Sequence, residues 1–540
     1  MKLKFHFKRA KVIHLDINEE GNYKTTAELA RKTAKSASFL VSGKVVSMLI
    51  QVFMFVVVAR LLLPKGYGIY TLALSTAGFA SAVGSLNIGT YLNERIPFLI
   101  AKKKTHQIKN ALGDAAIAIV LPGVALSLIG IALSVPIAEY VLHSVALYPV
   151  IIIAMATIAF SFIYNSFNLI LVGFHDGKSS GIGMILYSVV QAVFSILLVY
   201  LAGTLQGKIE GAIAGYIIAL FAASLFQIFA SSKPYGISFE IKGMRKRIGE
   251  MLRFSMPLTY SNIIGTIVTN FSVIFLGIFV LPSFVGYYGV ASRIGTLIDV
   301  VAGTMATVLI PMFAEAINSK GISGKIDRFF YYSVYFGLLF TTPMVLYVTV
   351  FAHALMNTLF SSYYNGSTFY MQLVGIGMLI GILGSFATQL VISTRETKVV
   401  FKYSLYVGIV EFLALLVLVP IFHVVGLIAA MLYVGGLATD ILFMRYLKKK
   451  GIRISFGKDL RILLANIILG VFLALLFLVG NPEIMLAAGI LVILVAYPPI
   501  LVKIGAVADE EMKLLRKIGG GVPLVGRILN MMIGYAEIFL

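Results

Sequence analysis

Few side chains in this sequence could do chemistry, and those that could lie inside long apolar segments. Lys44 is followed at three and seven positions by Ser47 and Gln51, a spacing that places all three on one face of a helix. A charge inside a membrane-spanning helix costs at least about 2.5–3.5 kcal/mol on insertion scales, so it needs a reason. We expect this stripe to line a cavity that binds an anionic group. The alternative is that Lys44 snorkels to the nearer interface, about 12 Å away.

Three further charges lie in apolar segments of the second half of the chain. Arg293 falls near the middle of a predicted helix over 285–310, and Asp299 lies on the same helix, rotated from it by about 120°. Glu411, midway along a predicted helix over 401–422, could pair with Arg293. Either these residues line a cavity, or Arg293 and Glu411 form a buried structural ion pair.

The sequence lacks the common motifs of enzymes. It has no Gly-x-x-x-x-Gly-Lys phosphate loop, no His-Glu-x-x-His metal motif and no Gly-x-Ser-x-Gly nucleophile elbow. It has no cysteine, which excludes disulfides, thiolate metal sites and cysteine nucleophiles. We therefore predict neither enzyme activity nor a bound metal or cofactor.

The chain that carries these residues is too apolar for a soluble protein. Of its 540 residues 59% are hydrophobic and only 12% are charged, with a mean hydropathy of +0.96. Soluble domains are about 45–50% apolar and about 25% charged. We identify about fourteen apolar runs of about 20 residues, each long enough to span a bilayer as a helix. The sequence therefore predicts an all-α, multi-pass protein, and we expect it in the cell membrane.

The net charge of +21 comes from alternate connections between these runs. If the N-terminus is cytoplasmic, the inner segments hold 39 of the 44 Lys and Arg, and three lie within helices. The outer loops then hold only Lys65 and Lys208. This bias follows the positive-inside rule and places both termini in the cytoplasm. It also explains the basic charge without a nucleic-acid partner.

Two turns, after the first and the seventh runs, share a pattern. Residues 63–70 and 281–288 both fit Leu-Pro-x-x-x-Gly-x-Tyr, 218 residues apart. Repeats six helices apart have the same orientation, so they imply two lobes related by an axis along the membrane normal. The same offset carries the stripe of the first helix onto a small and polar stripe of the seventh, Asn262, Gly265 and Thr269. We therefore expect two stripes that face each other across a central cavity.

The runs and their connections divide the chain into six parts. No outer connection is longer than about 16 residues, so function must reside within the bundle. The parts are a basic cytoplasmic tail (1–35), a first six-helix lobe (36–230), a basic cytoplasmic linker (231–251), a second six-helix lobe (252–445), two further helices with the basic loop before them (446–502), and a tail on the inner surface (503–540).

Four stretches of the sequence resemble a known family. ARLLLPKGYGIYTLA (59–73) and LNIGTYLNERIPFLIAKKK (86–104) are similar to the opening of polysaccharide and oligosaccharide-lipid flippases. VLPSFVGYYGVASRIG (280–295) and ATVLIPMFAEA (306–316) resemble the second half of the same family. These proteins belong to the multidrug/oligosaccharidyl-lipid/polysaccharide superfamily. The resemblance covers most of residues 36–445 and implies a V-shaped bundle that rocks between inward-open and outward-open states.

The resemblance also implies a cargo. This is a saccharide linked to a polyprenyl phosphate or pyrophosphate, moved from the inner to the outer leaflet for surface polysaccharide or glycoprotein biosynthesis. The family commonly places basic residues in the cavity on the first, second and eighth helices. Lys44 and Arg293 fit the first and the eighth, whereas the second helix carries no Lys or Arg here. The first half also lacks a deep carboxylate, which argues against the cation-coupled drug exporters of the superfamily.

Three functions remain open on the sequence alone. The leading hypothesis is a lipid-linked oligosaccharide flippase, whose partners are its cargo and the membrane lipids, with glycan-assembly enzymes as candidate protein partners. The second is a cation-coupled multidrug exporter of the same fold, which would depend on Glu411 or Asp299. The third is a non-transporting membrane scaffold for glycan-assembly enzymes.

Overall fold

The part of the chain that the computed structural model describes is almost entirely helical. That part is 19–84, 86–141, 147–296, 298, 323–393, 396–452, 459–509, 511–513, 516, 531 and 533–539, and it contains no strand. The longer helices are α1 (Glu19–Gly84), α2 (Ile88–Ala101), α3 (Thr105–Ala132), α5 (Tyr148–Gly173), α6 (Gly177–Leu201), α7 (Leu205–Ser232), α8 (Met244–Phe279), α10 (Ser323–Val350), α12 (Thr368–Gly377), α13 (Ile382–Ser393), α14 (Thr397–Ile428), α15 (Gly435–Lys449), α16 (Asp459–Leu475) and α17 (Pro482–Lys503).

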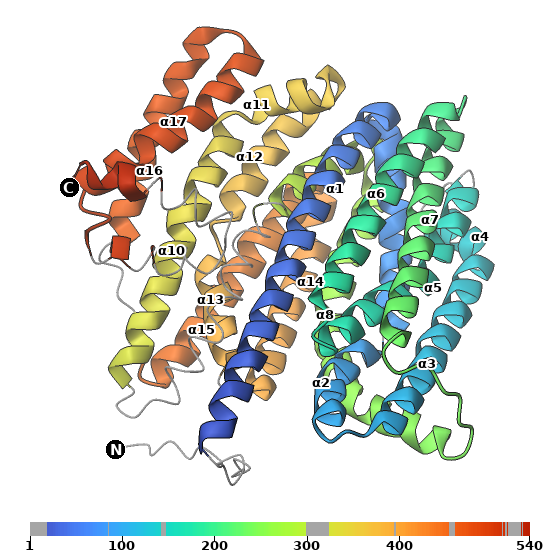
Figure 1. The fold of residues 1–540 in the computed structure, drawn as a ribbon. Coiled ribbons are helices and arrows are strands. Elements are labelled where there is room, and N and C mark those ends of the chain that lie inside the picture. Colours follow the sequence, from blue (N-terminus) through green and yellow to red (C-terminus); the bar gives the residue numbers. More distant parts are fainter. Residues whose placement is uncertain are drawn as a thin grey trace.

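Two of the helices are long enough to cross a membrane twice. The apolar part of α1, Ser38–Ala82, has 45 residues, which would measure about 68 Å if straight, against a hydrocarbon core of about 30 Å. It folds back at Leu63, whose φ of 59° lies outside the helical region, followed directly by Pro64. Figure 1 shows this turn at the top of the view, with the chain descending behind α6. The turn is the first of the two predicted from the repeat.

A second bend of the same kind occurs in the other half of the chain. The apolar stretch Lys398–Lys449 has 52 residues and bends at His423, three residues after Pro420. Within the described residues nine helices are long and apolar enough to span, or ten if the bent pair Ser362–Gly377 and Ile382–Ile392 is one span. The multi-pass, all-α architecture is therefore confirmed, and the total of fourteen spans stays a prediction.

We call the helices α1–α7 the N-lobe and α8–α15 the C-lobe. The end of the bundle that carries the turn between α2 and α3 and the linker between α7 and α8 is basic, so we call it the inner end.

In the N-lobe small residues let helices approach closely. Gly43 of α1 lies against Gly181 of α6, and Gly215 of α7 lies against Ser195 of α6.

Helix α2 occupies part of a segment that we expected to be a cytoplasmic connection. Its buried residues Ile88, Leu92, Ile96 and Leu99 recur every three or four positions, the spacing of one helix face, and the helix packs against α5. The basic residues between 95 and 104 obscured this pattern in the sequence, although they lie at the inner end of the helix, where positive charge is tolerated.

The linker between the lobes lies on the inner end of α3. The backbone N–H of Ser238 donates to the carbonyl of Lys109 at 3.2 Å. A side chain on Gly113 would collide with the carbonyl of Ser238, so glycine allows the close approach. In Figure 1 the linker descends from α7, passes outside α3 and enters α8 at the bottom of the bundle.

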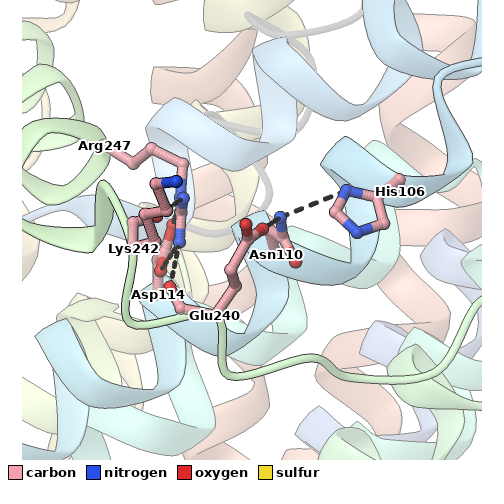
Figure 2. A network of polar contacts seen from close by, with 6 residues as sticks. All are labelled: His106, Asn110, Asp114, Glu240, Lys242 and Arg247. Atoms are coloured by element: carbon pink, nitrogen blue, oxygen red, sulfur yellow. Dashed lines mark hydrogen bonds and ion pairs between the residues drawn. The ribbon is translucent and has the colours of Figure 1, made fainter.

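Arg247 fastens the start of α8 to the same end of α3 (Figure 2). Its Nε and Nη2 donate to the two carboxylate oxygens of Asp114 at 2.5 and 3.1 Å, and this hydrogen bonding raises the pKa of the guanidinium. It also donates to the carbonyls of Glu240 and Lys242 at 2.6 and 2.9 Å. Asn110 of α3 donates in turn to the carboxylate of Glu240. The linker, α3 and the first turns of α8 are therefore tied into one body.

Removing Arg247 should destabilise the fold, because the carboxylate of Asp114 is completely buried. We expect Arg247→Ala to lower the free energy of unfolding by about 3–5 kcal/mol, as is typical when one partner of a buried ion pair is lost. Thermal unfolding of the detergent-solubilised protein measures the effect. Arg245→Ala, which removes an exposed arginine two residues away, is the matched control. Equal melting temperatures for the two variants would show that the pair does not stabilise the fold.

Helices α16 and α17 form an appended pair with a core of their own. This core joins them to α10 through Tyr335, Leu469 and Met485. Described residues of the tail beyond α17 pack into this core: Ala506 and Ile533 are buried there, and the hydroxyl of Tyr335 donates to the carbonyl of Ala506 at 2.6 Å. The position of the tail on the inner surface of the membrane stays a prediction.

Candidate functional site

The two repeated turns touch each other at the outer end of the bundle. A Cβ on Gly68 would collide with the carbonyl oxygen of Pro282, and a Cβ on Gly286 would collide with that of Pro64. Gly68 and Gly286 are 218 residues apart, and so are Pro64 and Pro282. The contact is therefore reciprocal, as expected where a twofold axis passes between equivalent surfaces. This is the arrangement that the sequence repeat predicts.

Further contacts around this point join the lobes into an outer seal. We use this name for the contact of the two turns together with the residues named here. Nε of Arg60 donates to the carbonyl of Leu359 at 2.6 Å, and the hydroxyl of Tyr364 donates to the carbonyl of Ala59 at 2.8 Å. The rings of Phe55 and Phe360 lie 5.1 Å apart. The outer ends of the lobes are closed against each other in this structure.

A cavity of about 610 Å³ lies nearer the inner end, between the N-lobe and α8. Asn165, Ser166 and Leu169 contribute from the last turns of α5, which ends at Gly173. The polar side chains that line it within the described part of the chain are all uncharged. They are Ser81, Asn87, Asn165, Ser166, Thr266, Thr269 and Asn270.

The two polar stripes do not face each other as expected. Thr269 of the second stripe lines the cavity. Ser47 of the first is buried against α6, where its hydroxyl lies within hydrogen-bonding distance of that of Ser188, and Gln51 donates to Ser188 at 3.3 Å. The close approach of α1 to α6 at Gly43 turns this face of α1 into the N-lobe. Lys44 is exposed on the inner half of α1 and is not among the cavity-lining residues.

Arg293 faces the N-lobe and not the expected partner Glu411. It follows the second repeated turn, is exposed, and lies one helical turn beyond Gly289, which packs against Tyr67 and Thr71 of α1. Residues four apart share a helix face. Arg293 therefore lies on the face of its helix that meets α1 of the N-lobe.

Glu411 lies within the C-lobe against Gly435 at the start of α15. Among the described residues it has no ion-pair partner. Asp440 lies on α15. It accepts hydrogen bonds from the backbone N–H groups of Gly381 and Gly384 at 3.2 and 2.6 Å, where the chain bends between α12 and α13. Asp299 and the side chain of Asn262 lie outside the described residues.

A cluster of three tyrosines inside the N-lobe, Tyr164, Tyr187 and Tyr216, was not found by sequence reasoning. Tyr164 and Tyr187 have ring centroids 5.0 Å apart, and Tyr187 and Tyr216 are 6.1 Å apart. The three residues lie on α5, α6 and α7, so no spacing in the sequence connects them. A partial signal was their position: each lies near the middle of an apolar run, where a phenol hydroxyl needs a partner.

Comparison with known proteins shows which family this chain belongs to. A family model described as "Polysaccharide biosynthesis protein" matches residues 33–317, more than half of the chain. The chain belongs to this polysaccharide biosynthesis family. A curated relative, the capsular polysaccharide biosynthesis protein CapF of Staphylococcus aureus, is 22% identical over 255 residues. That match covers 46% of this chain and 62% of CapF, so this chain spans less than two thirds of its relative.

The fold of this polysaccharide biosynthesis family member is similar to that of solved membrane transporters. The lipid II flippase MurJ in an inward closed conformation matches with a TM-score of 0.65 at 15% identity, over 86% of this chain and 98% of MurJ. An inward-facing multidrug transporter of the superfamily matches with a TM-score of 0.62 at 14% identity, over 76% and 98%. These two solved proteins show the likeness of fold alone. The resemblance to a polysaccharide biosynthesis family is confirmed by the family model, and the apolar helices confirm the location in a membrane.

Proposed function

We propose that this protein moves a polyprenyl-phosphate- or pyrophosphate-linked oligosaccharide from the inner to the outer leaflet by alternating access. The observation that carries the proposal is Arg293, an exposed cation of the C-lobe on the helix face that meets α1 of the N-lobe. A guanidinium binds phosphate through two parallel hydrogen bonds.

The energetics favour an anionic head group at this position. An unpaired arginine at membrane depth is costly, and a bound phosphate would offset that cost. Outward movement of a negative charge is also downhill in a cell that is negative inside, by about 2.3 kcal/mol per charge per 100 mV.

The outer seal and the inner cavity together describe one state of a transport cycle. The lobes are closed against each other at Gly68 and Gly286, while the cavity lies near the inner end of α5. An outward-open state requires the outer seal to part. The ion pair of Arg247 with Asp114 keeps the inner end of α8 on the N-lobe. When the lobes rock against each other, α8 must therefore bend farther along its length.

The other predicted residues take different parts in this proposal. Lys44, exposed on the inner half of α1, is a candidate for the first contact with an entering head group. Thr269 lines the cavity, whereas we assign Ser47 and Gln51 to the packing of α1 on α6. Asn262 and Asp299 remain cargo-binding candidates by sequence alone.

Native mass spectrometry of the purified protein tests the proposal. We expect a co-purified adduct whose fragments include a polyprenyl phosphate or pyrophosphate and a saccharide. Arg293→Ala should lose most of this adduct at equal protein yield, because the adduct depends on the phosphate contact. A wild-type protein that carries only ordinary phospholipid, even after incubation with a pyrophosphate-linked saccharide, would contradict the proposal.

A cation-coupled multidrug exporter is the second candidate, and one observation favours it. The carboxylate of Glu411 lies inside the C-lobe without an ion-pair partner among the described residues. Drug efflux that depends on a sodium or proton gradient and is lost in Glu411→Gln would support this function. Efflux is not expected if the cargo is a lipid-linked saccharide.

A further inference from the structure

We propose that the inner cavity is a binding site for uncharged sugar residues of the cargo. This inference rests on the proposed function and specifies which kind of saccharide the protein accepts. The cavity, of about 610 Å³, falls within the range of about 300–1,000 Å³ that is usual for small-molecule sites. Its polar lining comes from two lobes, with Asn165 on α5 and Asn270 on α8.

Asn165 is the clearest sign that the cavity holds a polar ligand. Its side chain is exposed into the cavity near the inner end of α5, and the structure gives it no hydrogen-bond partner among the described residues. Asn270 packs on Gly78 of α1 and donates one hydrogen bond, to the carbonyl of Thr266 at 2.8 Å. An amide has two donors and two acceptor lone pairs, so both residues have unused hydrogen-bonding capacity. Leaving that capacity unmet at membrane depth is unfavourable.

The chemistry of the lining matches a sugar. Each sugar hydroxyl both donates and accepts, as do the side chains of Asn, Ser and Thr. Phe162, Leu169 and Pro122 supply apolar surface in the same cavity, on which the C–H face of a sugar ring can lie. Small-molecule sites commonly combine an apolar wall with a few polar groups in this way.

The uncharged character of the described lining sets the specificity. Among the described residues that line the cavity there is no Lys, Arg, Asp or Glu. A uronate, sulfate or phosphate group on the sugar would lose its water here without a cation to pair with, which is strongly unfavourable. Arg293 does not line the cavity either. The pyrophosphate and the sugar are therefore recognised at different places, one charged and one neutral.

Binding to three synthetic probes tests this inference. The probes are undecaprenyl pyrophosphate alone, the same lipid carrying an N-acetylglucosamine disaccharide, and the same lipid with glucuronic acid as the second sugar. Affinities are measured with the full-length protein in lipid nanodiscs. We expect the wild type to bind the neutral disaccharide probe at least about tenfold more tightly than the glucuronate probe.

Substitutions in the cavity should act on the sugar and not on the pyrophosphate. Asn165→Ala should lower the affinity for the neutral disaccharide probe by about fivefold, the usual contribution of one hydrogen bond. The affinity for undecaprenyl pyrophosphate should not change. Asn165→Lys should reverse the preference between the two disaccharide probes. Asn365→Ala removes an exposed asparagine at the outer end and is the matched control, expected to bind all three probes as the wild type does.

The outcomes separate this inference from the proposed function. Two results would overturn the sugar site alone. One is an equal affinity of the wild type for the two disaccharide probes, and the other is an equal loss of affinity for all three probes in Asn165→Ala. If the wild type binds none of the three pyrophosphate lipids, the proposed function fails and the sugar site fails with it.

Discussion

Arg293→Ala should abolish most of the transport of a pyrophosphate-linked saccharide while leaving the protein folded. The guanidinium is exposed and makes no ion pair among the described residues, so its loss should cost little stability. A charge-assisted hydrogen bond contributes about 1.5–3 kcal/mol, and the expected loss in transport rate is about 10- to 100-fold. The measurement is the initial rate at which a fluorescent pyrophosphate-linked saccharide becomes accessible on the opposite leaflet of proteoliposomes.

Two further variants sharpen this prediction. Arg293→Lys keeps the charge but not the planar fork that matches phosphate, so we expect an intermediate rate. Arg245→Ala removes another exposed arginine, on the inner surface, and should transport normally. If Arg293→Ala transports as fast as Arg245→Ala, transport does not depend on a contact between Arg293 and the phosphate.

Gly68→Val should prevent the outer seal from closing. A Cβ at this position would lie only 1.7 Å from the carbonyl oxygen of Pro282, whereas non-bonded atoms rest about 3.5–4.0 Å apart. The two turns must separate to admit the side chain. If the closed outer seal is favoured 99:1 over the outward-open state, inverting that ratio takes about 5.5 kcal/mol. A clash of the new side chain with rigid backbone can supply this energy. We expect outward-open protein and a transport rate lowered at least tenfold.

Spin labels at the outer ends of the lobes measure this change directly. Because the chain contains no cysteine, Gln206→Cys on α7 and Tyr363→Cys just before α12 can be labelled without other changes, and both positions are exposed. We expect a longer interlabel distance in Gly68→Val than in the wild type. Gly203→Val is the matched control, since a Cβ there meets nothing within 4 Å. Unchanged distance distributions in Gly68→Val would refute the outer seal.

Local patterns in the sequence predicted the turns and the general architecture. Pro64 and Gly68 mark a sharp reversal between two apolar runs, and their recurrence at Pro282 and Gly286 made the repeat visible. Glycine is needed at both positions because the turns meet backbone to backbone. The membrane class followed from composition alone.

The direction of the polar stripes could not be predicted in the same way. A helical spacing shows that Lys44, Ser47 and Gln51 share a face, but not which helix that face meets. The contact of Gly43 with Gly181 decides it, and this contact depends on the packing of α1 on α6. The interior tyrosines were equally hidden, because they come from separate helices and meet only in the folded bundle.

The most direct test of the account is flipping by the purified wild-type protein in proteoliposomes. We predict that a pyrophosphate-linked saccharide crosses between leaflets at a rate that depends on the protein, and that an inside-negative potential, in vesicles where the inner face of the protein is inside, speeds its outward movement. A rate equal to that of protein-free vesicles, for every lipid-linked saccharide offered, would contradict the central claim.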